Sequence, residues 1–280
     1  MSDPLRQSLH GIWSATALAW GSHADYVDDR EATVTQAMLE ALGLRPEARV
    51  LELACGPGGA GLAAAELVGP RGEVVLSDIA PEMTAIAAQR ADARNLANVR
   101  TAQIDIENID FPDASFDAVL CREGLMLVPD PAAAVHDAHR VLVPGGRAAF
   151  AVWGPRDRNP WLGILLDAIT ATLGIPVPPP GMPGPFSLSD YGQLEGLLSS
   201  AGFDDISVRE VLTPMTAASF DDWWSVVPSL AGPLGPLLAS QPADVGSAIR
   251  AEAETALDQF RTQTGSFELP GLSFVGSGRH

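Results

Sequence analysis

The stretch V-L-E-L-A-C-G-P-G-G-A-G, which runs from Val50 to Gly61, decides the fold of this chain. An apolar run with one acid, Glu52, breaks into glycines and continues into the Ala- and Leu-rich residues 62–68. This pattern predicts a strand, a tight loop and a helix. Glycines let a backbone approach a ligand closely, and the N–H groups that open the next helix point at the ligand. The stretch therefore predicts a loop that binds a nucleotide cofactor.

Two cofactors are compatible with the glycines alone. Gly56, Gly58 and Gly61 match the G-x-G-x-x-G of dinucleotide-binding folds, and Asp78 lies at about the spacing of their ribose-binding acid. Glu52 argues against NAD, because that fingerprint requires no acid in the strand and a carboxylate at a strand end is costly without partners. The rest of the chain has to distinguish the two cofactors.

The word E-L-A-C-G-P-G, from Glu52 to Gly58, resembles motif I of the class I S-adenosylmethionine (SAM) methyltransferases. This resemblance implies that Glu52 lies beside the methionine end of the cofactor and that the glycines pass under it. Ala54 stands where many members of the family have the first glycine. A second segment, I-D-I-E-x-I-D-F-P-D-A-S-F-D-A-V-L-C at residues 104–121, is similar to the adenine-binding loop and fourth strand of the ubiquinone and menaquinone biosynthesis type of methyltransferase.

The same resemblance implies further cofactor contacts. Asp105 would accept the adenine amino group, and Ile106 would offer a backbone N–H and apolar contact. Asp78 closes the apolar strand 73–78, where an acid can accept both ribose hydroxyls; capping of the helix that begins at Pro81 is the alternative interpretation. NAD folds have no matching need for an acid at position 105, so the chain favours SAM. The expected cofactor-binding residues are Glu52, Ala54, Gly56, Gly58, Asp78, Ile79, Met83, Asp105, Ile106 and Cys121, with no metal.

Composition limits the partners of this protein. The 280 residues are 46% hydrophobic, enough for a sizeable core. The 17 basic residues, all Arg, against 35 acidic ones give a net charge of -18, which opposes nucleic acid as a partner. No apolar run approaches the roughly 20 residues of a membrane span, so we expect a cytoplasmic protein. The expected partner is a small, largely apolar aromatic substrate, and a homodimer is left open.

The alternating strand and helix patterns predict an α/β fold with a seven-stranded, Rossmann-like sheet. The sheet is expected to be mostly parallel, with an antiparallel last strand near residues 272–278 and helices on both faces. Residues 1–44 are expected to form an N-terminal helical lid on a core of residues 45–280, within one structural domain. Insertions at about 156–190 and 213–262 contain Trp, Phe, Met and Pro and are expected to cap the substrate. Such a lining suits a flat ring system.

Glu123, just beyond the fourth predicted strand, is the candidate general base. Members of the resembled family commonly have Gln there. A carboxylate could instead take a proton from the N–H or O–H of an aromatic ring as the ring attacks the methyl group. Pairing of Glu123 with the cofactor's ammonium or with an Arg is the alternative. His23 and Tyr26, at a break in the N-terminal helices, are further candidates for a proton relay.

Two classes of function follow from these residues. The first is a SAM-dependent methyltransferase of secondary metabolism that acts on a small aromatic or heteroaromatic metabolite such as an indole, phenol or quinol. Carbon is slightly preferred over oxygen or nitrogen as the methylated atom. The second is a SAM-binding regulatory protein without transfer activity. Glu52, Asp78 and Asp105 support binding in both classes, whereas only Glu123 and the aromatic cap favour an enzyme.

Overall fold

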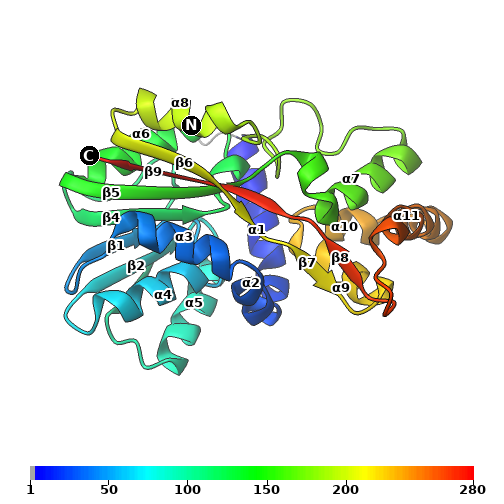
Figure 1. The fold of residues 1–280 in the computed structure, drawn as a ribbon, viewed down its shortest axis with the longest axis horizontal. Helices are drawn as coiled ribbons and strands as arrows, with labels where there is room; N and C mark the ends of the chain where they lie inside the picture. Colours follow the sequence, from blue (N-terminus) through cyan, green and yellow to red (C-terminus); the bar gives the residue numbers. More distant parts are fainter. Residues whose placement is uncertain (1–3) are drawn as a thin grey trace.

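The computed structural model describes residues 4–280 and shows a seven-stranded sheet with helices on both faces (Figure 1). The strand order is β3-β2-β1-β4-β5-β9-β6. Only β9 runs antiparallel to its neighbours, and the other adjacent pairs are parallel. The predicted sheet, with its antiparallel last strand, is therefore confirmed. The strands are β1 (Arg49–Glu52), β2 (Glu73–Asp78), β3 (Val99–Gln103), β4 (Phe116–Arg122), β5 (Leu142–Trp153), β6 (Asp204–Leu212) and β9 (Leu272–Arg279).

Two apolar layers hold the helices on the sheet. On one face, α3 (Ala32–Leu42), α4 (Gly59–Val68) and α5 (Pro81–Ala93) pack through buried residues such as Met38 and Leu62. On the other face, α6 (Pro131–Val141) and α8 (Tyr191–Ser200) pack through residues such as Val135 and Leu194. The inner strands β1, β2 and β9 are buried along most of their length, as their apolar runs predict, whereas the edge strands β3 and β6 are largely half-buried or exposed.

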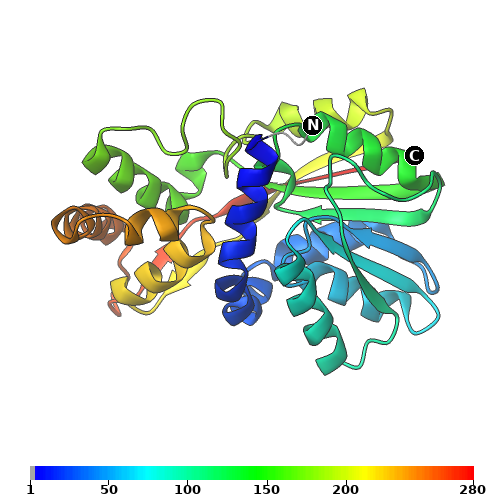
Figure 2. The same cartoon turned by 180° about the vertical axis from the view of Figure 1, so that it is seen from behind.

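The other N-terminal helices lie away from the sheet core. Figure 2 shows α1 (Pro4–Ser22) running between the sheet and the rest of the molecule, where it contacts α5 and α9. The short α2 (Ala24–Arg30) follows and contacts α4. In contrast, α3 is part of the sheet core, so a lid role is proposed here only for α1 and α2. No helix among residues 4–280 has the length and apolar character that crossing a bilayer requires.

A third apolar cluster lies beside the sheet and is called the cap here (Figure 1). Its centre includes Trp161, Trp223 and Phe267, and the indole N–H of Trp223 donates to the Trp161 carbonyl at 3.0 Å. Residues from both expected insertions meet in it. Its two-stranded sheet was not predicted from the sequence. The cap elements are α7 (Pro160–Leu173), β7 (Met215–Ala217), α9 (Phe220–Leu230), α10 (Leu234–Ala239), α11 (Ala243–Leu257) and β8 (Phe267–Leu269).

Gly124, two residues after β4, gives a test of packing at the strand ends. A Cβ at this position would lie 2.4 Å from the Ala54 Cβ, and Ala54 itself has a left-handed φ of 49°. Gly124→Ala should lower the free energy of unfolding by about 1–3 kcal/mol through overpacking. Ala54→Gly removes the clashing methyl and should restore most of that loss in the double variant.

Urea unfolding of the two single variants and the double variant measures this coupling. Gly196→Ala is the matched control, because a Cβ at this helical position meets open space. Strictly additive effects of Gly124→Ala and Ala54→Gly would contradict the proposed contact.

Candidate active site

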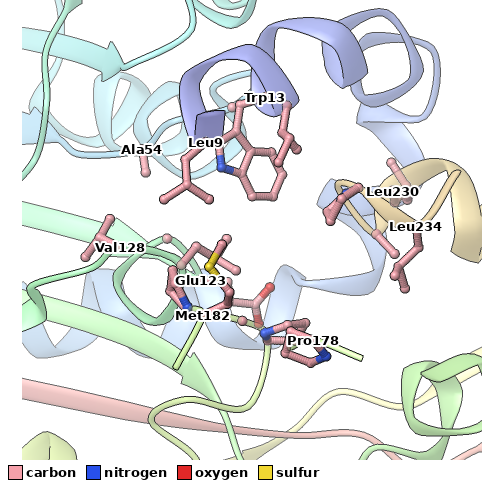
Figure 3. A pocket seen from close by; sticks show the side chains of 18 of the residues that line it. Leu9, Trp13, Ala54, Glu123, Val128, Pro178, Met182, Leu230 and Leu234 are labelled. Carbon is pink, nitrogen blue, oxygen red and sulfur yellow. The ribbon is translucent and has the colours of Figure 1, made fainter. Parts of the chain in front are cut away.

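A cavity of about 630 Å³ lies at the carboxyl ends of β1, β2 and β4. Figure 3 shows its wall, with Leu9 and Trp13 of α1 on one side and Glu123, Met182 and Pro178 on the other. Most of the lining opposite the strand ends is apolar. This apolar part includes Leu9, Ile12, Trp13, Leu162, Leu166, Ile175, Pro176, Val177, Pro178, Pro179, Met182, Pro183, Leu230, Leu234 and Leu237.

Glu52 is a buried carboxylate at the end of β1, with 1% of its surface exposed. Its Oε2 accepts the backbone N–H of Gly61 at 2.9 Å. Position 61 must be glycine, because a Cβ there would lie 2.4 Å from this oxygen and 2.2 Å from Leu76 Cδ2. Burial raises the pKa of Glu52 to about 8, although the positive charge of Arg122 and the Gly61 N–H oppose this rise. Glu52 lines the cavity, so its charged form would be stabilised by a cationic ligand group.

Asp78 ends β2 with both carboxylate oxygens held by the backbone. Oδ2 accepts the N–H of Gly56 at 2.9 Å, and Oδ1 accepts the N–H of Ala80 at 3.0 Å. Each oxygen retains a second lone pair that can accept a ligand hydroxyl. The alternative of a helix cap is wrong in its simple form, because Ala80 occupies the N-cap position of α5. Burial raises the pKa of Asp78, and these backbone N–H groups oppose the rise.

Asp105 lies in the cavity wall beyond β3, where the loop returns to the sheet. Its Oδ1 accepts the N–H of Glu107 at 3.0 Å. Arg6 of α1 donates to Glu107 Oε2 at 2.7 Å, and its Nε lies 3.8 Å from Asp105 Oδ2. The first turns of α1 are thus tied to the loop that contains Asp105.

Glu123 is a half-buried residue held in an unusual backbone conformation. Its φ of 60° is left-handed, which costs a non-glycine residue about 1–2 kcal/mol. The backbone N–H donates to Ala151 O at 2.9 Å, and the carboxylate accepts the Ser273 hydroxyl at 2.9 Å. Burial and the negative charge of Glu31 raise the pKa of Glu123 to about 8. A strained, titratable side chain in a cavity wall is typical of a functional site.

The other residues expected at the site divide into two groups. Those in the wall of the large cavity are Ala54, Gly56, Ile79, Met83 and Ile106. Two lie outside that wall: Gly58 is the left-handed N-cap of α4, and Cys121 is buried in the sheet core.

The two candidates for a proton relay also separate. Tyr26 lines a smaller cavity that also includes Glu123, whereas His23 lines neither this cavity nor the large one. Among residues 4–280, no group of three or more His, Cys, Asp or Glu side chains could hold a metal.

A charge network at the cavity wall, centred on Arg122, was not predicted from the sequence. Arg122, whose side chain is 8% exposed, lies 3.4 Å from Asp28 and donates to the Thr35 hydroxyl at 2.8 Å. Asp28 also accepts Arg90 at 2.6 Å, and Arg90 donates to the Pro57 carbonyl at 2.9 Å. The network fixes α2 against the glycine loop. An arginine at the end of an apolar strand was its only signal in the sequence.

The geometry of this chain is that of a class I methyltransferase: a seven-stranded sheet with one antiparallel strand and an acid-lined cavity at its carboxyl edge. A family model described as a methyltransferase domain matches residues 50–146. The YcgJ protein from Bacillus subtilis aligns over 88% of this chain and 97% of its own, with a TM-score of 0.60 and 22% identity, which concerns the fold alone.

Two curated relatives are similar to this chain in amino-acid sequence. The ubiquinone/menaquinone biosynthesis C-methyltransferase UbiE of Ectopseudomonas mendocina is 42% identical over 168 residues, 60% of this chain and 57% of the relative. UbiE of Ectopseudomonas oleovorans is 40% identical over 148 residues, 52% of this chain and 75% of the relative. The chain belongs to the class I SAM-dependent methyltransferase family. It spans about half the length of most of the curated relatives it matches.

Glu52→Gln should change how stability depends on pH. The pKa of Glu52 is about 8 in the folded state and near its ordinary value of 4.5 in the unfolded chain, so between these values the folded state binds the extra proton. The stability of the wild type therefore falls as pH rises through this range. The variant has no carboxyl group at this position, so its stability should not fall for this reason. The free energy of unfolding of the variant minus that of the wild type should therefore increase by at least about 1 kcal/mol from pH 5 to pH 9. One pKa unit is worth about 1.4 kcal/mol.

Urea unfolding at the two pH values measures this shift. Glu254→Gln, on the exposed face of α11, is the control and should show no such shift. A difference between the Glu52 variant and the wild type that stays constant with pH would refute the assignment.

Proposed function

We propose that this protein transfers a methyl group from SAM to a small aromatic or heteroaromatic metabolite, most favourably at a ring carbon, with Glu123 as the general base. The observation that carries this proposal is the position of Glu123 in the wall of an otherwise apolar cavity that also contains Glu52 and Asp78. The two UbiE relatives are C-methyltransferases of ubiquinone and menaquinone biosynthesis, which supports a ring carbon as the methylated atom.

The residues of the cavity fit the chemical groups of SAM. The buried carboxylate of Glu52 suits the ammonium of its methionine part, and Asp78 has lone pairs for the two ribose hydroxyls. Asp105 suits the adenine amino group, and Ile79 and Ile106 offer apolar contact to the ring. NAD binding would require neither an acid at position 52 nor a hydrogen-bond acceptor at position 105.

The bound cofactor supplies an electrophilic methyl group on a sulfonium, and the protein's own task is alignment and proton removal. An in-line displacement gains most from holding the nucleophile and methyl carbon in position in a dry site. The prolines and leucines of the cavity wall exclude water. A ring that took this methyl group would give up one proton, and the Glu123 carboxylate in the cavity wall would accept it.

We propose α1 and α2 as the lid, since Arg6 links α1 to the loop of Asp105, and Asp28 of α2 lies against the glycine loop. Tyr26 is kept as a candidate relay residue because it shares the smaller cavity with Glu123. His23 is not kept. A cytoplasmic role in secondary metabolism is also part of the proposal, and homodimer formation is left open.

Transfer of label from labelled SAM to a panel of indoles, phenols and quinols tests the reaction. Methylated product with a new carbon–carbon bond supports the proposal, whereas product on oxygen or nitrogen replaces the preferred atom. Tight SAM binding without transfer to any compound would leave the regulatory alternative.

Glu123→Gln should lower kcat at least about 100-fold, the usual contribution of a general base. Its affinity for S-adenosylhomocysteine should stay within about threefold of the wild type, because the amide keeps the size of the side chain. The kcat/KM of the wild type should rise with pH up to a pKa near 8, since the base must lose its proton to act. This rise should be absent in the variant. Unchanged turnover in Glu123→Gln would exclude Glu123 as the base.

A further inference from the structure

Ser273, the second residue of β9, places a buried hydroxyl beside the candidate base. The residue is fully buried, and its neighbours across the sheet are Trp153 of β5 and Val211 of β6. The hydroxyl donates to Oε1 of Glu123 at 2.9 Å, across 150 positions of sequence. A buried hydroxyl is costly without a partner, so the hydrogen bond stabilises Ser273 in the sheet and also holds the carboxylate.

The backbone that carries this carboxylate is fixed independently of Ser273. Glu123 has a left-handed φ of 60°, and its N–H donates to Ala151 O at 2.9 Å. The next residue, Gly124, lies so close to Ala54 that a Cβ there would meet the Ala54 Cβ at 2.4 Å. The side-chain torsions are then the remaining freedom of Glu123, and a hydrogen bond to one carboxylate oxygen limits them.

The two carboxylate oxygens of Glu123 have different surroundings. Within residues 4–280, the Ser273 hydroxyl is the one hydrogen-bond donor to this carboxylate, and it uses Oε1. Oε2 has no such partner, yet it does not belong to the buried, unpaired polar atoms of this part of the chain, so it keeps surface that a ligand can reach. Glu123 lines the large cavity (Figure 3). Oε2 is therefore the oxygen that a bound molecule can reach.

The titratable and charged groups around this carboxylate come from the N-terminal helices and β4, and they are Tyr26, Arg30, Glu31 and Arg122. Burial and the negative charge of Glu31 raise the pKa of Glu123. The two arginines and the Ser273 hydrogen bond lower this pKa, because each of them stabilises the charged form. None of the four groups is hydrogen-bonded to the carboxylate, so its direction depends on Ser273.

We propose that Ser273 is the positioning residue of the Glu123 base: its hydroxyl holds Oε1 and so presents Oε2 to the substrate. This inference rests on the proposed function and adds a residue to its reaction. When Oε2 takes the proton that the ring gives up, Oε1 can still accept the Ser273 hydroxyl, so the hydrogen bond persists. Ser273 keeps its own proton and is not part of a relay.

Titration of the Glu123 carboxyl by ¹³C NMR, on protein labelled in its Glu carboxyl groups, tests this contact without turnover. The signal that is lost in Glu123→Gln identifies the residue. Loss of a hydrogen bond to a charged group should raise the pKa of Glu123 by about one unit in Ser273→Ala. Ser277→Ala is the matched control and should leave this pKa unchanged, because Ser277 is a buried serine on the same face of β9.

The pH dependence of kcat/KM tests the role in the reaction, with a substrate that the label-transfer panel identifies. In Ser273→Ala the rise of kcat/KM should move up by about one pH unit, so kcat/KM at neutral pH should fall about tenfold. The affinity for S-adenosylhomocysteine should stay within about threefold of the wild type, because Ser273 is not in the cavity wall. Ser277→Ala should keep the wild-type profile. A merely structural serine would lower stability and leave the profile unmoved.

The two measurements separate this inference from the proposed function. An unchanged pKa of Glu123 in Ser273→Ala overturns the inference, and so does a shift that Ser277→Ala shares. A kcat/KM profile that does not move in Ser273→Ala, while Glu123→Gln lacks turnover, also overturns it. A raised pKa in Ser273→Ala, together with no methyl transfer by the wild type to any compound, refutes the proposed reaction but upholds the contact of Ser273 with Glu123.

Discussion

The rest of the site depends on a carboxylate buried at the end of β1. A charge in this position is tolerated only with partners, and Glu52 obtains them from the Gly61 N–H and the nearby Arg122. The hydrogen bond from the Gly61 N–H to Glu52 requires a glycine at the start of α4. The nearby positive charge comes from Arg122, a buried arginine at the end of β4 that pairs with Asp28 of α2. One buried acid thus links the glycine loop, the adjacent strand β4 and the helix α2.

Parallel strands explain why the remaining acids gather. Glu52 and Asp78 end β1 and β2, and Asp105 follows β3 closely, so all three reach the same edge of the sheet. The sheet can supply only one side of a cavity. The cap cluster and α1 supply the other side with apolar side chains, so the cavity has acids along the strand ends and an apolar wall opposite them.

Features that depend on the order of neighbouring residues along the chain could be predicted from the sequence. Glu52, Asp78 and Asp105 follow short apolar strands, so their place at one sheet edge could be inferred from position alone. The three-residue strands β7 and β8 could not, because their pairing joins segments about fifty residues apart and depends on the cap core. The Arg122–Asp28 contact and the smaller cavity also arise from long-range packing. His23 was misplaced for a related reason: closeness to Tyr26 in sequence does not decide which helix face meets a cavity.

A crystal structure of the protein with S-adenosylhomocysteine tests the central claim most directly. The account predicts the ammonium of the ligand close to Glu52, the ribose hydroxyls on Asp78, and the adenine amino group on Asp105. The sulfur should point across the cavity toward Glu123. A nucleoside bound away from Asp78 and Asp105, or a sulfur directed away from Glu123, would contradict the account.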